Sequence, residues 1–207
     1  PTGSENGVII RGLRLPRTGA GLLAGGALGL AGALMQGHTR NPIADPGILG
    51  ITQGAALAVV LSVFSFGITG IHGTVWFGFA GALVGALAVV GIGSIGRGGA
   101  TPVTLALAGA AISYLLQAIT SAIVLMDQQS LDTYRFWKVG SISITEVTPL
   151  YQILPFALVG CVLGLANARG LNALALGEDV ARSLGHRVGL SRALGVASIA
   201  MLVGAAV

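Results

Sequence analysis

Residues 11–54 read RGLRLPRTGAGLLAGGALGLAGALMQGHTRNPIADPGILGITQG, and this stretch determines the fold class. A rim of arginines leads into a long run of glycine, alanine and leucine. A polar break with two prolines follows, and a second apolar run begins directly after it. A helix needs about 20 mostly apolar residues to cross the hydrocarbon core of a bilayer. The stretch therefore predicts a membrane-spanning helix, a short turn and the start of a second span.

The composition of the whole chain agrees with a membrane protein. Of its 207 residues, 54% are hydrophobic and 9% are charged, whereas soluble domains carry about 25% charged residues. A mean hydropathy of +0.87 would leave a soluble protein too little polar surface, so lipid is expected to cover much of the chain. The 11 basic residues exceed the 7 acidic ones, but they are spread over helix ends, so nucleic-acid binding is not indicated.

No metal site and no cofactor is predicted. The single cysteine, Cys161, excludes a disulfide within the chain. The three histidines, His38, His72 and His186, stand apart from one another in the sequence. They are interpreted as interfacial or loop residues rather than as metal or haem ligands.

Runs without Asp, Glu, Lys or Arg predict the spans. They lie at roughly 18–39, 46–71, 73–96, 101–126 and 147–168, with a shorter run at 193–207. The expected fold is all-α: a polytopic transmembrane helical bundle with five complete spans and one partial span. Because the chain does not begin with methionine and its last residue lies in an apolar run, residues 1–207 are expected to be an internal piece of one transmembrane domain, truncated at both ends.

Glycine recurs at four-residue spacing, which places small residues on one helix face and lets helix backbones approach closely. The sequence therefore predicts tight packing within one subunit along four such faces, which contain Gly21, Gly25 and Gly29; Gly50 and Gly54; Gly81 and Gly85; and Gly160 and Gly164.

The polar break contains Asn41, Pro42, Asp45 and Pro46. Proline disfavours helix at the residue before it. Asp45 is a good N-cap and Pro46 suits the first helical position, so a new helix is expected to start there and to run through Gly54. The break is either a simple turn between helices or part of the cytoplasmic side of a translocation path.

Two further segments are polar. Residues 127–148 are predicted to form a loop, whose Phe136 and Trp137 read as an interfacial belt. In residues 167–192 a short helix is expected to start at Glu178 and Asp179, after a tight turn at Gly177. Gly185 is expected to cap that helix. On the residues alone, this segment could be an amphipathic helix lying on the membrane surface.

Several motifs, in this order and at these separations, carry a family resemblance. They are RLPR at 14–17, a small-residue helix ending in Gln36, RNPIADPGILG at 40–50, a Trp–x–x–Gly–Ser element at Trp137, Gly140 and Ser141, and ALGEDVARSLG at 175–185. The chain closely resembles the FecCD/BtuC-type permease subunits of bacterial ABC importers for iron–siderophore complexes, haem and cobalamin. The resemblance covers essentially the whole chain. Gly37, His38 and Thr39 replace the bulkier residues common before RNP.

The resemblance implies a type II ABC importer permease fold in the cell membrane. It implies a permease subunit that moves an iron–siderophore complex from an extracytoplasmic binding protein into the cytoplasm, with cobalamin or haem as alternative cargo. The implied partners are ABC ATPase subunits, the substrate-binding protein, a second permease subunit (identical or not) and the lipid bilayer. The chain is not expected to be an enzyme, since it contains no Walker P-loop.

The resemblance also implies roles for particular residues. Arg14 and Arg17, at the outer mouth of the first span, would dock the binding protein. The loop at 170–190 would be the cytoplasmic coupling loop that contacts the ATPase. Its coupling residues are Gly177, Glu178, Asp179, Ala181, Leu184 and Gly185, with Ala181 and Leu184 expected to form a small apolar face for the groove of the partner.

One polar stripe points to a path through the membrane. Ser113, Gln117, Thr120 and Ser121 recur three to four residues apart within residues 105–125. Unpaired polar groups are penalised against lipid, so the stripe is interpreted as lining a path at a dimer interface. Hydrogen bonding between helices of one subunit is the alternative. Two other classes stay open: an ion-coupled secondary transporter, and a membrane-embedded enzyme or assembly factor. The predicted spans contain no ionisable residue that could couple transport to an ion, which disfavours the secondary transporter.

Overall fold

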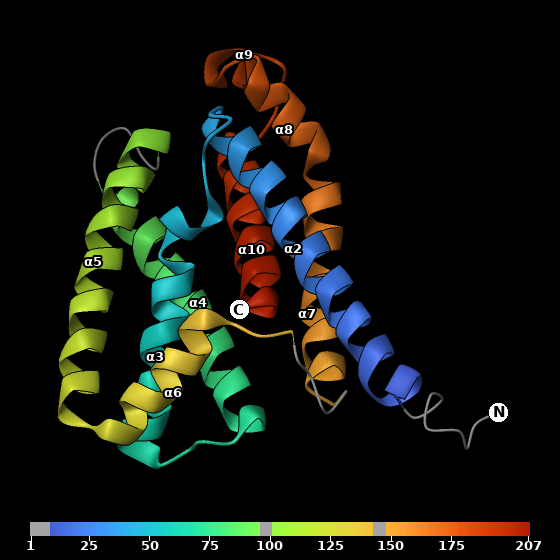
Figure 1. Cartoon of the computed structure of the whole chain (residues 1–207). Helices are drawn as coiled ribbons and strands as arrows, with labels where there is room; N and C mark the ends of the chain where they lie inside the picture. Colours follow the sequence, from blue (N-terminus) through green and yellow to red (C-terminus); the bar gives the residue numbers. More distant parts are fainter. Residues whose placement is uncertain (1–8, 96–100, 143–147) are drawn as a thin grey trace.

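The computed structural model describes residues 9–95, 101–142 and 148–207, and within these residues it is all-helical (Figure 1). The fold class predicted from the sequence is therefore confirmed. The helices, in chain order, are the π-helical turn η1 Ile10–Arg14, α2 Leu15–Thr39, the 3-10 helix η2 Pro46–Leu49, α3 Ile51–Phe66, α4 Ile71–Gly93, α5 Pro102–Met126, α6 Gln128–Val139, α7 Thr148–Ala166, α8 Ala168–Ala175, α9 Glu178–Ser183 and α10 Val188–Ala206.

Helix α10 forms the centre of the bundle. It packs against α2, α4 and α7, and Figure 1 shows it enclosed between them. Ser198, Ile199, Leu202 and Val203 on α10 are almost completely buried. Helices α3 and α4 form a second closely packed pair, and α5 lies against both of them.

Five helical segments in the described part of the chain are long and apolar enough to cross a membrane: Ile10–Thr39, Ile71–Gly93, Pro102–Met126, Thr148–Ala166 and Val188–Ala206. The apolar run predicted as a partial span at 193–207 belongs to α10, which begins earlier, at Val188, and is long and apolar enough to cross a membrane. Because the predicted spans were runs without charged residues, this span was expected to begin after Arg192, but the helix includes this arginine. Residue 96, at the end of the predicted span 73–96, and residue 147, at the start of the predicted span 147–168, lie outside the described residues.

The predicted continuous span at 46–71 is wrong. Gly50 adopts a left-handed conformation (φ 68°), which separates η2 from the 16-residue helix α3. At about 1.5 Å per residue, α3 is about 24 Å long and falls short of the roughly 30 Å hydrocarbon core.

The polar break is ordered by its own side chains. The Asn41 side-chain oxygen accepts a hydrogen bond from the Ile43 backbone N–H at 3.1 Å, and the Asp45 carboxylate accepts one from Gly47 N–H at 2.7 Å. Asp45 is extended and caps η2, with Pro46 in first position, as predicted. The expected uninterrupted helix through Gly54 is replaced by a 3-10 turn and the Gly50 break.

The glycine pattern correctly predicts two contacts and fails at a third. A Cβ atom at Gly54 would overlap the carbonyl oxygen of Gly81, so α3 and α4 meet backbone to backbone. Likewise, Gly160 on α7 leaves room for Leu202 of α10. In contrast, a Cβ at any of the stripe residues Gly21, Gly25 and Gly29 would meet nothing within 4 Å. Spacing reveals that residues share a face, but it does not reveal whether a helix of the same chain covers that face.

The predicted loop at 127–148 contains the helix α6. Asp127 is its N-cap, because its carboxylate accepts a hydrogen bond from Ser130 N–H at 2.7 Å. Helix α6 packs on α3 and α5. Trp137 is half-buried against the main core, whereas Phe136 is 82% exposed, so only Phe136 has the exposure expected of an interfacial belt.

Candidate functional site

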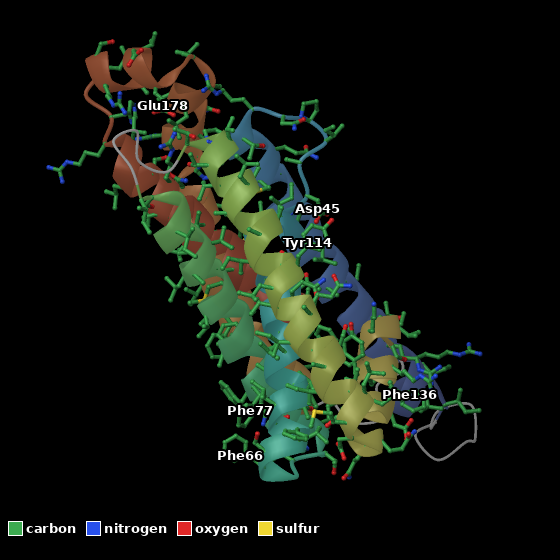
Figure 2. The ribbon with its side chains drawn as sticks, turned by 90° about the vertical axis from the view of Figure 1, so that its left-hand side faces the viewer. Asp45, Phe66, Phe77, Tyr114, Phe136 and Glu178 are labelled. Atoms are coloured by element: carbon green, nitrogen blue, oxygen red, sulfur yellow. The ribbon has the colours of Figure 1, made fainter. Side chains whose placement is uncertain are left out.

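The candidate site residues gather at opposite ends of the bundle. Figure 2 shows Glu178 at one end and Phe66, Phe77 and Phe136 near the other. The first end is formed by α8, α9 and the last turn of α2, and the second by α6 and the first turns of α2 (Figure 1).

The segment at 168–187 folds as a helical hairpin, here called the α8–α9 hairpin. Gly177 (φ 107°) and Gly185 (φ 79°) both adopt backbone conformations that L side chains rarely adopt. Beyond Gly185, His186 N–H donates to the carbonyl of Ala181 at 2.9 Å, which closes α9 in the manner of a Schellman motif. The predicted turn, helix start and cap are confirmed here.

A small apolar cluster holds the α8–α9 hairpin together. It consists of Ala173, Leu174, Ala181 and Val188, and Ala181 is completely buried. The expectation that the Ala181 side chain faces a partner is therefore wrong, because Ala181 packs inward. The exposed apolar side chains of α9 and its cap are Val180 and Leu184, at 44% and 60% exposure.

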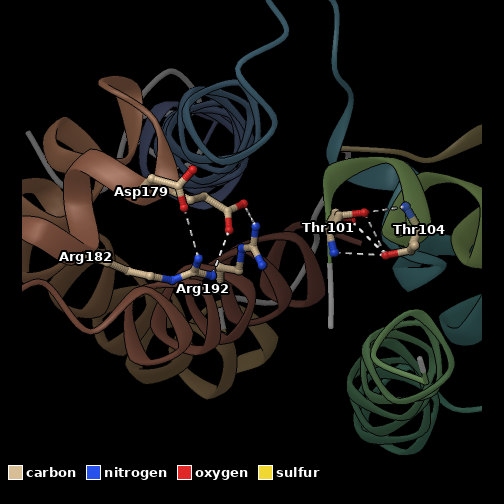
Figure 3. A network of polar contacts seen from close by, with 6 residues as sticks. Thr101, Thr104, Asp179, Arg182 and Arg192 are labelled. Carbon is tan, nitrogen blue, oxygen red and sulfur yellow. Dashed lines mark hydrogen bonds and ion pairs between the residues drawn. The ribbon is translucent and has the colours of Figure 1, made fainter. Parts of the chain in front are cut away.

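Glu178 joins the hairpin to the central helix. One oxygen of its carboxylate pairs with the Arg192 guanidinium of α10, and the other pairs with Arg182 at 3.3 Å. Figure 3 shows the guanidinium groups of Arg182 and Arg192 side by side within this network, with Asp179 paired to Arg182 at its edge. The two side chains of the Glu178–Arg192 pair are only 23% and 19% exposed.

A second polar contact lies beside this pair. The Asn167 side-chain N–H donates to the Ser191 carbonyl at 2.8 Å, and the Ser191 hydroxyl donates to the Asn167 side-chain oxygen at 2.6 Å. The Asn167 amide nitrogen also lies 3.2 Å from Nε2 of His38 on α2. Together, Glu178, Arg192, Ser191, Asn167 and His38 form what we call the polar junction.

The sequence did not predict the polar junction. His38 was interpreted as an interfacial or loop residue, but it lies in α2 and its ring packs on the backbone of Gly195, where a Cβ would overlap it. Arg192 was placed in the polar segment at 167–192, directly before the apolar run at 193–207. An available signal was the single arginine near the start of an apolar helix, with an acidic residue 14 positions before it.

The opposite end of the bundle contains a mostly apolar cavity of about 290 Å³. Helices α2, α4, α6, α7 and the end of α10 contribute its walls, and its lining includes Trp137, Gly140 and Ser141. Arg14, the last residue of η1, and Arg17, in the first turn of α2, lie beyond it, and both are exposed. The structure thus brings the Trp–x–x–Gly–Ser element and the arginine-bearing helix to the same end.

The polar stripe of α5 is divided between two environments. Thr120 is 1% exposed, and its hydroxyl donates to the Leu116 carbonyl at 2.8 Å. Ser113 is half-buried, while Gln117 and Ser121 are exposed. This bond lies within α5 itself and is not the hydrogen bond between helices that the alternative interpretation of the stripe expected.

The described residues contain no group of three or more His, Cys, Asp and Glu side chains that could hold a metal ion. At one end of the bundle, an ion pair joins the α8–α9 hairpin to the central transmembrane helix α10. At the other end, a mostly apolar cavity lies near the exposed Arg14 and Arg17.

The chain was compared with known proteins. The model of the FecCD transport family matches residues 2–207. The chain is 46% identical to the ferric enterobactin transport system permease protein FepD of Escherichia coli, over 98% of this chain and 61% of that protein. It is 41% identical to the iron(3+)-hydroxamate import system permease protein FhuB of Bacillus subtilis, over 96% of this chain and 52% of that protein.

A solved inward-facing ABC transporter of the metal-chelate type has the same fold. It superposes with a TM-score of 0.85 at 28% identity, over 98% of this chain and 64% of that one. The chain thus spans less than two thirds of the length of these relatives. Together with the five apolar helices, the similarities confirm the predicted fold and the location in the cell membrane.

Proposed function

Because the chain belongs to the FecCD transport family, we propose that it is a membrane-spanning permease subunit of an ATP-driven ABC importer for an iron–siderophore complex. The observation that carries the proposal is the family match over residues 2–207. For the cargo, the support is the 46% identity to a ferric enterobactin permease, against 37% to a hemin and 36% to a cobalamin permease. Haem and cobalamin are therefore the alternative cargoes.

In this proposal the α8–α9 hairpin faces the cytoplasm and contacts a separate ATPase subunit, which hydrolyses ATP. Val180 and Leu184 support this role, because they present apolar side chains at the end of the bundle. Gly177 and Gly185 set the shape of the hairpin, and Glu178 and Asp179 begin its second helix. The polar break at Asn41, Pro42, Asp45 and Pro46 is proposed to lie at the cytoplasmic mouth of the path.

Arg14 and Arg17 are proposed to dock an extracytoplasmic binding protein. Guanidinium groups form bidentate hydrogen bonds with carboxylates, so acidic residues on the binding protein would give both affinity and orientation. Two exposed arginines three residues apart, one at the end of η1 and one in the first turn of α2, suit that role.

The path for a bulky chelate is proposed to lie between two permease subunits rather than within one. The cavity of about 290 Å³ lies just below the roughly 300–1,000 Å³ typical of small-molecule pockets, so it is small for a bulky chelate. Ser113, Gln117 and Ser121 on α5 would line the path. Thr120 would instead stabilise the packing of α5 within its own subunit.

Uptake by intact cells tests the function. Cells lacking their own permease would receive the gene together with its ATPase and binding protein, and would be offered ferric catecholate, ferric hydroxamate, hemin and cobalamin separately. Uptake of an iron–siderophore complex, abolished when the ATP site of the ATPase is inactivated, is expected. Uptake of hemin or cobalamin alone would correct the cargo. Uptake that persists without ATP hydrolysis would favour the secondary-transporter alternative.

The docking residues are tested in the same cells with the double variant Arg14→Glu, Arg17→Glu. We expect uptake to be lost while the amount of protein in the membrane is unchanged, because the reversed charge repels an acidic partner. The matched control is Arg135→Glu, a charge reversal at an exposed arginine of α6. Normal uptake and normal affinity for the binding protein in the double variant would remove Arg14 and Arg17 from the docking surface.

A further inference from the structure

We propose that Glu178 is a positioning residue: it clamps the α8–α9 hairpin to the central helix α10 through Arg192, instead of contacting the ATPase. The hairpin would then transmit a push or pull from the ATPase directly to α10. This inference rests on the proposed function, since it assigns the internal connection of the proposed coupling segment.

The first support is that this chain already engages the carboxylate of Glu178 at both oxygens. Oε1 pairs with Arg192 and Oε2 with Arg182 at 3.3 Å. The Glu178 side chain is 23% exposed, whereas the adjacent Asp179 side chain is 99% exposed and pairs with Arg182 at 3.4 Å. Of the two neighbouring acids, Asp179 is the one presented to a partner, and Glu178 is turned toward α10.

The second support is the position of Arg192. Its side chain is 19% exposed on the first turns of a transmembrane helix. An unpaired cation at a half-buried position is costly, and removing one partner of such a pair destabilises more than the pair itself contributes. Arg192 therefore holds the hairpin in place strongly, because release of Glu178 would leave its charge uncompensated.

The third support is that the clamp continues into neighbouring helices. Ser191, next to Arg192, exchanges two hydrogen bonds with Asn167, which follows the end of α7. Asn167 reaches His38 on α2 at 3.2 Å. The polar junction is tightly packed, because a Cβ at Gly195 would overlap the His38 ring and one at Gly170 would overlap the Ser191 hydroxyl. A displacement of α9 is thus passed to α10, α7 and α2 together.

A double-mutant cycle tests the clamp in the purified protein without any partner. The variants are Glu178→Gln, Arg192→Gln and the combination, with Asp179→Asn as the matched control. Amide hydrogen exchange of the hairpin is the measurement. Each single variant should speed amide exchange of the hairpin about tenfold, an effect between those expected for losing a surface ion pair and a buried one. The double variant should exchange no faster than the faster of the two single variants, because both remove the same interaction. The control should leave exchange unchanged.

The same variants are then reconstituted in vesicles with the ATPase and binding protein. Both single variants should retain the ATPase on purification but transport several-fold less cargo per ATP hydrolysed. Additive effects in the cycle, or exchange that matches the control, would overturn the inference. Loss of ATPase binding in Glu178→Gln alone, with Arg192→Gln normal, would do so too, because it would mark Glu178 as a direct contact. If the cycle behaves as expected but the unaltered protein shows no ATP-dependent transport, the proposed function fails while the clamp stands.

Discussion

Asn167 and Ser191 form a reciprocal pair: the side-chain amide of Asn167 donates to the backbone carbonyl of Ser191 at 2.8 Å, and the Ser191 hydroxyl donates to the Asn167 side-chain oxygen at 2.6 Å. Asn167 is only 3% exposed. This pair ties the end of α7 to the beginning of α10 in a region with little access to water.

Replacing Asn167 with alanine should destabilise the protein by about 1–3 kcal/mol, because the buried Ser191 groups lose their partner. Thermal unfolding of the purified protein in detergent measures the effect. Asn172→Ala on α8 is the control, since Asn172 is an exposed asparagine in the same segment. Equal unfolding temperatures for both variants would show that the pair contributes nothing to stability.

Gly195→Ala should lower the unfolding temperature and break the contact between His38 and Asn167. The added methyl group would overlap the His38 ring, and overpacking of this kind costs about 1–3 kcal/mol. Gly189→Ala lies on the same helix, where nothing approaches within 4 Å of a Cβ. That control should be neutral or stabilising by about 0.5–1 kcal/mol, because alanine is the better helix former. An equal drop in unfolding temperature for Gly195→Ala and Gly189→Ala would contradict a specific overlap with the His38 ring.

Gly54→Ala should separate α3 from α4, because its methyl group would overlap the carbonyl oxygen of Gly81. We expect lower yield of folded protein and faster proteolysis of the loop between these helices. Gly25→Ala serves as the comparison, since its Cβ would meet nothing within 4 Å. If Gly25→Ala proves the more damaging change in intact membranes, a neighbour outside this chain covers that face of α2.

Ala181→Trp should disrupt the α8–α9 hairpin from within, because Ala181 is completely buried against Ala173, Leu174 and Val188. Exchange or proteolysis of the hairpin should therefore increase even in the absence of the ATPase. Val180→Trp, at a 44% exposed position, should leave the isolated protein unchanged and affect only ATPase binding. An undisturbed hairpin in Ala181→Trp would contradict the packing described for α9.

Cysteines introduced along α5 should react unequally with a water-soluble thiol reagent after Cys161 is replaced. Gln117→Cys and Ser121→Cys should be labelled, because these positions are exposed on the proposed path, whereas Thr120→Cys should be protected inside the subunit. Labelling is measured in membranes that contain the assembled importer. Protection of all three positions would move the path away from this face.

The long helices and the hairpin were predictable because they depend on local signals. Charge-free apolar runs located the spans, and Asp45 and Pro46 located the start of η2. Thr101 and Thr104, which bond reciprocally at the start of α5 in Figure 3, show the same local logic. The glycines of the turns, such as Gly177 and Gly185, are local signals too, because their own positive φ angles are enough to favour glycine there.

What escaped prediction depends on contacts between distant residues. The break at Gly50 comes from its left-handed backbone, and a Cβ there would lie 3.1 Å from Val89 of α4, neither of which the spacing of glycines reveals. The start of α10 at Val188 was missed because the helix includes Arg192, which pairs with Glu178, and the inward orientation of Ala181 goes with its packing in a cluster that includes Val188. A count of charges along the sequence treats each charge as isolated, whereas a folded chain pairs them.

The pairing of Arg192 with Glu178 has a consequence for biogenesis. Only 14 residues separate Glu178 from Arg192, so the two charges of the pair reach the membrane close together during synthesis. Once they pair, the start of helix α10 is nearly neutral overall, which lowers the cost of holding an arginine in a membrane-spanning helix.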